Sequence, residues 1–114
     1  MADSECDEAF ALKGVRMRRA AKIDANQPEI VSALRKIGAR VVPTHTVGQG
    51  FPDLIVSTPD GSRTVLMELK DPKQPPSARK LTPAQEEFHA AWTGEIYVVE
   101  TPEQAIECLT RRAE

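Results

Sequence analysis

A tight turn between two apolar segments is the feature that most constrains this chain. Residues 51–57 and 63–70 are rich in apolar side chains, and the pair Asp60-Gly61 stands between them. An Asp-Gly pair in such a place predicts a β-hairpin, because both residues tolerate the positive φ that a short turn requires. A turn centred on this pair puts Asp53 directly opposite Glu68, whether the loop has two residues or four. The sequence therefore predicts both a hairpin and its register.

The register decides which side chains share a face. Directly opposed residues of antiparallel strands have Cβ atoms about 4.5 to 5.5 Å apart, so the carboxylates of Asp53 and Glu68 would point the same way and repel each other. Alternation along the strand adds Lys70 to the face of Glu68 and turns Met67 and Leu69 to the opposite face. We therefore expect two acids and one amine on one face, at the open end of the hairpin.

This group of side chains indicates divalent-cation chemistry. Mg²⁺ takes one or two carboxylates and keeps several waters, so Asp53 and Glu68 suit it. The ion would offset their repulsion, bind a phosphate and stabilise charge that develops in an in-line displacement. Three roles stay open for Lys70: it lowers the pKa of the attacking water, orients that water, or neutralises charge at phosphorus. The reaction indicated is phosphodiester hydrolysis, and the alternative is a solvated strand face with a weak ion pair.

Three capping signals mark the starts of helices. Asn26 and Glu29 have the spacing of a capping box, and apolar residues follow at helical intervals. Thr82 and Gln85 form a second box, with proline at the first helical position. Thr101 opens a last helix in the same way. We expect three helices that begin at these positions.

Four strands are expected, at residues 40–45, 51–57, 63–70 and 95–100. The proline-rich segment 71–80 is too irregular for a helix or a strand. The element order is therefore helix, three strands, helix, strand, helix, which indicates an α/β fold.

Composition bounds the class of protein. With 114 residues, 40% hydrophobic and 28% charged, the chain suits one compact soluble domain. Residues 1–24 show no core pattern, so we expect a flexible or loosely docked arm there and the domain at 25–114. The apolar runs are far shorter than the roughly 20 residues of a membrane-spanning helix, and the acidic start is unlike a signal peptide. We expect no membrane partner and a cytoplasmic location.

The arm carries an uneven charge. Between Lys13 and Lys22 there are five basic residues and no acid, among them Arg18 and Arg19. Two interpretations stay open: an arm that contacts phosphates, or a solvated tail. The two cysteines lie near opposite ends of the sequence and indicate neither a disulfide framework nor a zinc site.

The motifs resemble those of the PD-(D/E)xK nuclease superfamily, and within it the small VRR-NUC domains and Holliday-junction resolvase-like phage proteins. Pro52-Asp53 matches the first part of the motif, and Glu68-Leu69-Lys70 matches the second. Two further matches are Gly48-x-Gly50 upstream and Leu81-Thr82-x-x-Gln85 at the start of a helix. The resemblance covers roughly residues 26–110, element order included.

The resemblance implies a restriction-endonuclease-like core, with a central four-stranded mixed sheet flanked by helices and Mg²⁺ or Mn²⁺ as cofactor. It implies that Asp53 and Glu68 are metal ligands, helped by the backbone carbonyl of Leu69, and that Lys70 is the catalytic lysine. Gln85 would lie at the edge of the active site, although its place in a capping box is a sufficient reason for a glutamine there.

The first helix departs from the family pattern. Family members usually carry a glutamate on it, and here that position holds Gln27, with Glu29 half a turn away. Three alternatives stay open: the amide oxygen of Gln27 is a ligand, Glu29 substitutes, or water takes the place. Further residues that are expected to contact nucleic acid are Lys73, Arg79, Lys80 and His45.

Together these features predict a metal-dependent DNA endonuclease of a bacterial or phage-infected cell, with a homodimer as one expected form. A preference for branched or irregular DNA is implied by the resemblance alone, since a fold does not determine a substrate. The alternative is a nuclease fold without turnover that serves as a DNA-binding or scaffolding module.

Overall fold

The computed structural model describes residues 23–111, so the basic segment with Arg18 and Arg19 lies outside the described residues. The helices are α2 (Gln27–Lys36), α3 (Pro83–Ala91) and α4 (Pro102–Thr110), and the strands are β1 (Arg40–Pro43), β2 (Leu54–Ser57), β3 (Thr64–Leu69) and β4 (Ile96–Val99). The predicted element order is confirmed. One short 3₁₀ helix, η2 (Pro76–Arg79), lies in the proline-rich segment, where the prediction of no regular element was wrong.

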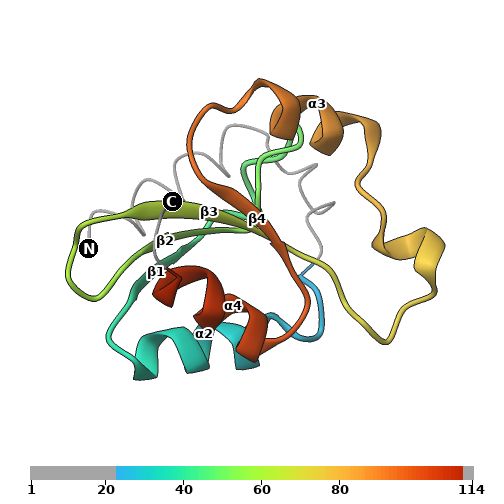
Figure 1. The fold of residues 1–114 in the computed structure, drawn as a ribbon. Coiled ribbons are helices and arrows are strands. Elements are labelled where there is room, and N and C mark those ends of the chain that lie inside the picture. Colours follow the sequence, from blue (N-terminus) through green and yellow to red (C-terminus); the bar gives the residue numbers. More distant parts are fainter. Residues whose placement is uncertain (1–22, 112–114) are drawn as a thin grey trace, which may run out of the picture.

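The four strands form one mixed sheet in the order β1-β2-β3-β4 (Figure 1). The first two pairings are antiparallel and the pairing of β3 with β4 is parallel. In the hairpin, Leu54 pairs with Met67 and Ser57 pairs with Thr64, which is the predicted register. Asp53 immediately precedes β2, and Glu68 lies near the end of β3. The hairpin therefore brings these two acids to the same edge of the sheet.

Helices α2 and α4 pack against each other and cover one face of the sheet (Figure 1). The core lies between them and the sheet, and it includes Met67 and Leu69, as alternation along β3 predicted. Burial of this apolar surface is the main force that holds the layers together. The members of the core are Ile30, Leu34, Ala39, Val41, Leu54, Val56, Val65, Met67, Leu69, Val99, Ala105, Cys108 and Leu109.

The start of α2 corrects one prediction. Asn26 is the N-cap residue, but its side chain makes no capping hydrogen bond, and Glu29 is exposed. The Asn26 amide instead donates to the carbonyl oxygens of Lys70 (3.0 Å) and Glu100 (2.8 Å). The capping box predicted at this position was therefore wrong. These two bonds tie the residues that precede α2 to the ends of β3 and β4.

Helix α3 stands apart from the other helices, at one end of the sheet (Figure 1). None of its residues is buried, and its predicted capping box between Thr82 and Gln85 is confirmed. Gly50 packs on its first turn so closely that a Cβ atom there would lie 2.3 Å from the carbonyl oxygen of Ala84. With φ at +82° as well, this position requires glycine. The loop that leads to Asp53 is thereby held against the helix that carries Gln85.

None of the helices in the described part of the chain is long and apolar enough to cross a membrane.

Candidate active site

Asp53 is held in place by backbone hydrogen bonds across the hairpin. Its amide donates to the carbonyl oxygen of Met67 at 3.0 Å, which extends the β2–β3 ladder by one residue. Its carboxylate oxygen Oδ2 accepts a hydrogen bond from the amide of Leu69 at 2.8 Å. A hydrogen bond from a backbone amide fixes the orientation of a carboxylate. The Asp53 side chain therefore lies beside the end of β3, where Glu68 also lies.

Glu68 is an acid that is buried almost completely, with 2% of its surface exposed. Its Oε2 accepts a hydrogen bond from the Gln85 amide at 2.9 Å and lies 3.9 Å from Nζ of Lys70. Its Oε1 is buried and has no hydrogen-bond partner among the described residues. Burial, reinforced by the charge of Asp53, raises the pKa of Glu68 to about 8, and the charge of Lys70 opposes this rise only in part.

Gln85 joins the acid to the lysine. Its Oε1 accepts from Nζ of Lys70 and from the backbone amide of Thr82, both at 2.9 Å. Because both partners are donors, the carbonyl oxygen must face them, and the amide nitrogen is left to donate to Glu68. The same side chain thus completes the α3 capping box and fixes the positions of Glu68 and Lys70. A position at the edge of the cavity and a place in the capping box are therefore compatible for Gln85.

These side chains line one cavity of about 140 Å³. The structure brings together Asp53, Glu68, Leu69, Lys70 and Gln85, all of which the sequence singled out. It also adds residues that the sequence did not single out, and the full lining is Asp24, Asp53, Glu68, Leu69, Lys70, Asp71, Gln74, Ala78 and Gln85.

Asp24 is the functional candidate that sequence reasoning missed. It was assigned to the N-terminal arm, yet it lines the cavity, and its charge adds to the rise in the pKa of Glu68. The signal that would have located it is the side chain of Asn26, which ties this segment to the ends of β3 and β4. That signal is tertiary, and the sequence around Asp24 does not contain it.

The other predicted residues lie elsewhere. Gln27 lines a separate cavity beside α2, although it is buried and its Oε1 has no partner in the described part of the chain. Glu29 is exposed and lines neither cavity. His45 is half-buried and lies in a turn two residues after the end of β1, which is shorter than the predicted strand 40–45. Lys73 and Lys80 are exposed.

Arg79 belongs to η2 and is engaged locally. Its Nε donates to the carbonyl oxygen of Gln74 at 3.0 Å, and its guanidinium lies 3.7 Å from the carboxylate of Glu100. The hydrogen bond lies within the proline-rich segment, and the ion pair links this segment to the residue that follows β4. Gln74 and Ala78 from the same segment line the cavity, so this segment forms one of its walls.

The donors at the cavity fit a divalent cation. Within residues 23–111, no three acidic, histidine or cysteine side chains come close enough together to hold an ion. The donors at the adjacent strand ends are the two carboxylates of Asp53 and Glu68, with the backbone of Leu69 beside them, and Asp24 and Asp71 line the same cavity. Mg²⁺ takes one or two carboxylates and fills its remaining positions with water. The buried, unpaired oxygen of Glu68 is a donor whose burial a cation would offset.

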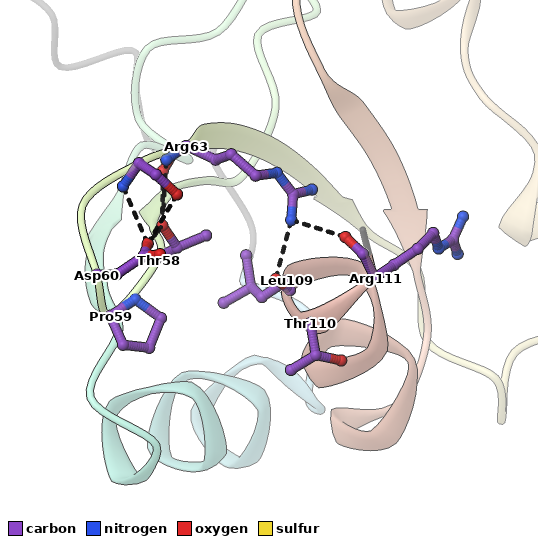
Figure 2. Close-up of a pocket in the computed structure, with 8 residues that line it drawn as sticks. Thr58, Pro59, Asp60, Arg63, Leu109, Thr110 and Arg111 are labelled. Atoms are coloured by element: carbon purple, nitrogen blue, oxygen red, sulfur yellow. Dashed lines mark hydrogen bonds between the residues drawn. The ribbon is translucent and has the colours of Figure 1, made fainter. Parts of the chain in front are cut away.

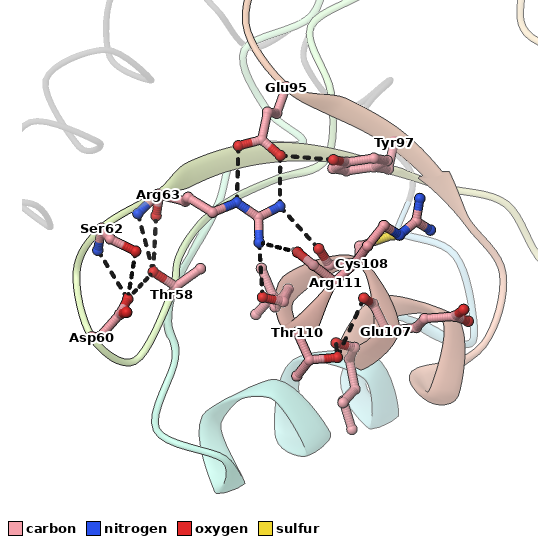
Figure 3. Close-up of polar contacts among 12 residues, drawn as sticks. Thr58, Asp60, Ser62, Arg63, Glu95, Tyr97, Glu107, Cys108, Thr110 and Arg111 are labelled. Carbon is pink, nitrogen blue, oxygen red and sulfur yellow. Dashed lines mark hydrogen bonds and ion pairs between the residues drawn. The ribbon is translucent and has the colours of Figure 1, made fainter. Parts of the chain in front are cut away.

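A larger cavity, of about 470 Å³, lies at the other end of the hairpin, between the turn and the end of α4 (Figure 2). The guanidinium of Arg63 binds both oxygens of Glu95, at 3.0 and 2.6 Å. It also donates to the last carbonyls of α4, those of Cys108, Leu109 and Arg111 (Figure 3). An arginine in this position caps the negative end of the helix. No lining residue of this cavity carries an unpaired buried polar atom among those the structure describes.

The four-stranded mixed sheet, with two carboxylates and a lysine at adjacent strand ends, defines an α/β architecture of the kind that the sequence predicted. No family model matches the sequence, and no curated protein matches it. A solved structure described as a "VRR_NUC domain" matches with a TM-score of 0.54 and 19% sequence identity, covering 79% of this chain and 100% of that one. The protein therefore has the fold of a VRR_NUC domain, and the predicted fold is confirmed.

Proposed function

We propose that this protein is a divalent-metal-dependent nuclease that hydrolyses phosphodiester bonds in DNA. The observation that carries this proposal is the cavity in which Asp53 and Glu68 lie beside the Lys70 amine, with one buried oxygen of Glu68 unpaired. A strongly perturbed acid next to a like charge, in a concave site, is a typical sign of a functional centre. The fold shared with a VRR_NUC domain supports the same assignment.

Asp53 and Glu68 would hold Mg²⁺ or Mn²⁺, together with the backbone carbonyl of Leu69. When bound, such an ion stabilises the negative charge that develops on a phosphoryl oxygen. The bond from the Leu69 amide keeps the Asp53 carboxylate aimed at the cavity. The Gln85 amide keeps one oxygen of Glu68 occupied, so the other is the one that faces a cation.

Lys70 supplies the positive charge of the protein itself. Its Nζ is held at 2.9 Å from the Gln85 carbonyl oxygen and only 8% of the residue is exposed, so its position is well defined. Nζ has three protons to donate, and Gln85 uses one of them. The others are available to orient an attacking water or to neutralise charge at the scissile phosphate.

The substrate we propose is DNA of branched or otherwise irregular structure, cut in one strand by each copy of the cavity. The exposed Lys73 and Lys80 flank the segment that forms a wall of the cavity, where they would meet neighbouring phosphates. His45, in the turn after β1, would contact the DNA strand there. Symmetric cutting of two strands would require two copies of the chain, so a homodimer belongs to this proposal.

A second candidate is a nuclease fold that binds DNA without turnover. One observation favours it: neither Gln27 nor Glu29, the two candidates for a ligand from the first helix, lines the cavity. Under this alternative, salt-sensitive binding to DNA would persist and no divalent ion would produce cleavage.

The two candidates are separated by a cleavage assay with linear, flapped and four-way-junction DNA in Mg²⁺ or Mn²⁺. The proposal expects nicking by the wild type and none above background by Asp53→Ala and Lys70→Ala, while both variants still bind DNA without metal. Glu29→Gln and Lys36→Ala are matched controls, because they remove the same charges from exposed residues of α2 outside the cavity lining. Equal cleavage by all five proteins would place the active centre elsewhere.

A further inference from the structure

A row of aromatic rings leads away from the candidate active site. Phe51 lies two residues before Asp53, and its ring meets that of Phe88 edge to face, with centroids 5.2 Å apart. Phe88 lies three residues after Gln85, and its ring stacks on Trp92 at 5.4 Å with an interplanar angle of 18°. The row is therefore anchored to the loop that precedes Asp53 and to the helix that carries Gln85.

Trp92 differs from the other two rings in its exposure. Phe51 and Phe88 are half-buried, whereas 42% of Trp92 is exposed, and it is the aromatic residue among the exposed large hydrophobic side chains of the described chain. Its indole also lies against Gly94. A Cβ atom at Gly94 would lie 2.9 Å from the indole Nε1, so the glycine leaves the room that the ring occupies.

Packing among residues 23–111 does not account for this exposed ring. The contact between Phe51 and Phe88 already joins α3 to the loop before Asp53, and Trp92 lies beyond it, at the C-cap of the helix. Phe88 backs the indole, so the ring is held flat against a neighbour. An exposed aromatic ring that is backed by a second ring and lies near a proposed nucleic-acid site is the arrangement on which unpaired bases stack.

We propose that Trp92, backed by Phe88, is a stacking platform for an unpaired base of the DNA strand whose phosphate lies in the candidate active site. This inference rests on the proposed function and names a feature of the substrate. Trp92 lies seven residues after Gln85 and hence about 10 Å along the helix axis. That distance corresponds to about three stacked base steps. The preferred strand is therefore one with unpaired bases a few nucleotides from the cleaved phosphate.

Stacking of this kind tolerates any base sequence, because every base has a π-face. The platform would therefore select DNA by strandedness and not by sequence. A fully paired duplex keeps its bases inside the helix and leaves the indole without a partner, unless the duplex opens at the site.

The test uses the fact that Trp92 is the only tryptophan of the chain, so intrinsic tryptophan fluorescence reports on this ring alone. The full chain is titrated, in EDTA, with a single-stranded oligonucleotide and with a blunt duplex of the same length. The proposal expects saturable quenching of the indole emission by the single strand and little by the duplex.

Affinity is measured in parallel by the anisotropy of labelled DNA. Trp92→Leu, which keeps an apolar side chain but no ring, is expected to weaken single-strand binding about 5- to 100-fold. Trp92→Phe should stay within about threefold of the wild type. Val47→Ala is the matched control, since it removes another exposed apolar side chain (53% exposed) and should not change affinity. Circular dichroism and thermal unfolding confirm that each variant is folded.

Several outcomes would overturn the platform. Binding of the single strand without quenching, or equal affinity of Trp92→Leu and the wild type, would exclude it while metal-dependent nicking by the wild type leaves the proposed function intact. Absence of both DNA binding and cleavage would reject the platform and the proposed function together. If Trp92→Leu does not fold, the fluorescence of the wild-type protein still decides.

Discussion

The two ends of strand β3 are built on opposite electrostatic principles. At its start, Arg63 uses its guanidinium to bind both oxygens of Glu95 and three carbonyls at the end of α4, and this pairing lowers the pKa of Glu95 to about 2. At its end, burial and a neighbouring acid raise the pKa of Glu68 to about 8. One end is therefore arranged for stability, and the other carries an electrostatic cost that a bound cation and substrate would offset.

The largest expected effect concerns activity at the Glu68 end. Lys70→Met should reduce cleavage about 1,000-fold, because it removes the charge proposed to act at the phosphate. Its free energy of unfolding should change much less than its activity. The comparison is made by single-turnover cleavage and urea denaturation of the same preparations. A Lys70→Met protein with full activity would break the functional half of the comparison.

The next effect concerns stability at the Arg63 end. Arg63→Ala should lower the free energy of unfolding by about 2 to 3 kcal/mol, since it removes the cationic partner of Glu95 and leaves the end of α4 uncapped. Arg63→Lys should recover only part of the loss, because an ammonium cannot form the two-pronged contact. Urea denaturation measures both. Wild-type stability in Arg63→Ala would mean that this network is incidental.

Glu68→Gln should raise the free energy of unfolding where Arg63→Ala lowers it. The carboxyl has an ordinary value of 4.5 when unfolded and a pKa of about 8 when folded, so the folded state binds more protons between these values. Stability without metal should therefore fall as pH rises from about 4.5 through 8, and Glu68→Gln should remove this fall.

At pH 8 without metal, Glu68→Gln should be more stable than the wild type by on the order of 2 kcal/mol. Adding Mg²⁺ should raise the melting temperature of the wild type and leave that of the variant unchanged. Thermal unfolding across pH, with and without Mg²⁺, measures this. A variant that is less stable than the wild type at pH 8 would contradict the electrostatic cost assigned to the Glu68 end of β3.

A smaller effect is expected at Glu95. Because its pKa is lowered in the folded state, chiefly by the hydrogen bond from Arg63, its contribution is present above about 4.5 and is lost as pH falls through about 2. Glu95→Gln should cost less than about 1 kcal/mol at neutral pH, since the pair is partly exposed. The stability of the variant should then depend less steeply on pH below about 4.5, as measured by acid unfolding. The same pH dependence in variant and wild type would mean that Glu95 does not contribute to stability in this way.

The smallest expected effect is that of Asp24. Its charge adds to the negative potential at Glu68, so Asp24→Asn should weaken Mg²⁺ binding about threefold and leave the fold intact. Calorimetric titration with Mg²⁺ measures the change. A loss as complete as that of Asp53→Asn would instead make Asp24 a direct ligand.

Local signals explain which parts could be predicted from the sequence. The hairpin register depends on the turn at Asp60-Gly61 and on alternation along two strands, and both are contained in neighbouring residues. The same register located Asp53, Glu68 and Lys70 at one cavity. The Thr82 capping box was predictable for the same reason, because its partners are three residues apart.

The parts that could not be predicted depend on distant partners. The side chain of Asn26 was expected to cap its own helix, but its acceptors are 44 and 74 residues away. The same two hydrogen bonds hold the segment of Asp24 beside the cavity. The partners of Arg63 lie 32 to 48 residues away, and no pattern around it in the sequence indicated them. Long-range polar contacts are set by the fold, which local patterns do not specify in detail.

The central claim is that Asp53 and Glu68 share one divalent cation beside Lys70. Isothermal titration of the folded chain with Mn²⁺ at pH 8 tests it directly. The expected result is one ion per chain for the wild type and for Glu29→Gln, with binding lost in both Asp53→Asn and Glu68→Gln. Undiminished Mn²⁺ binding in either of these two variants would contradict the claim.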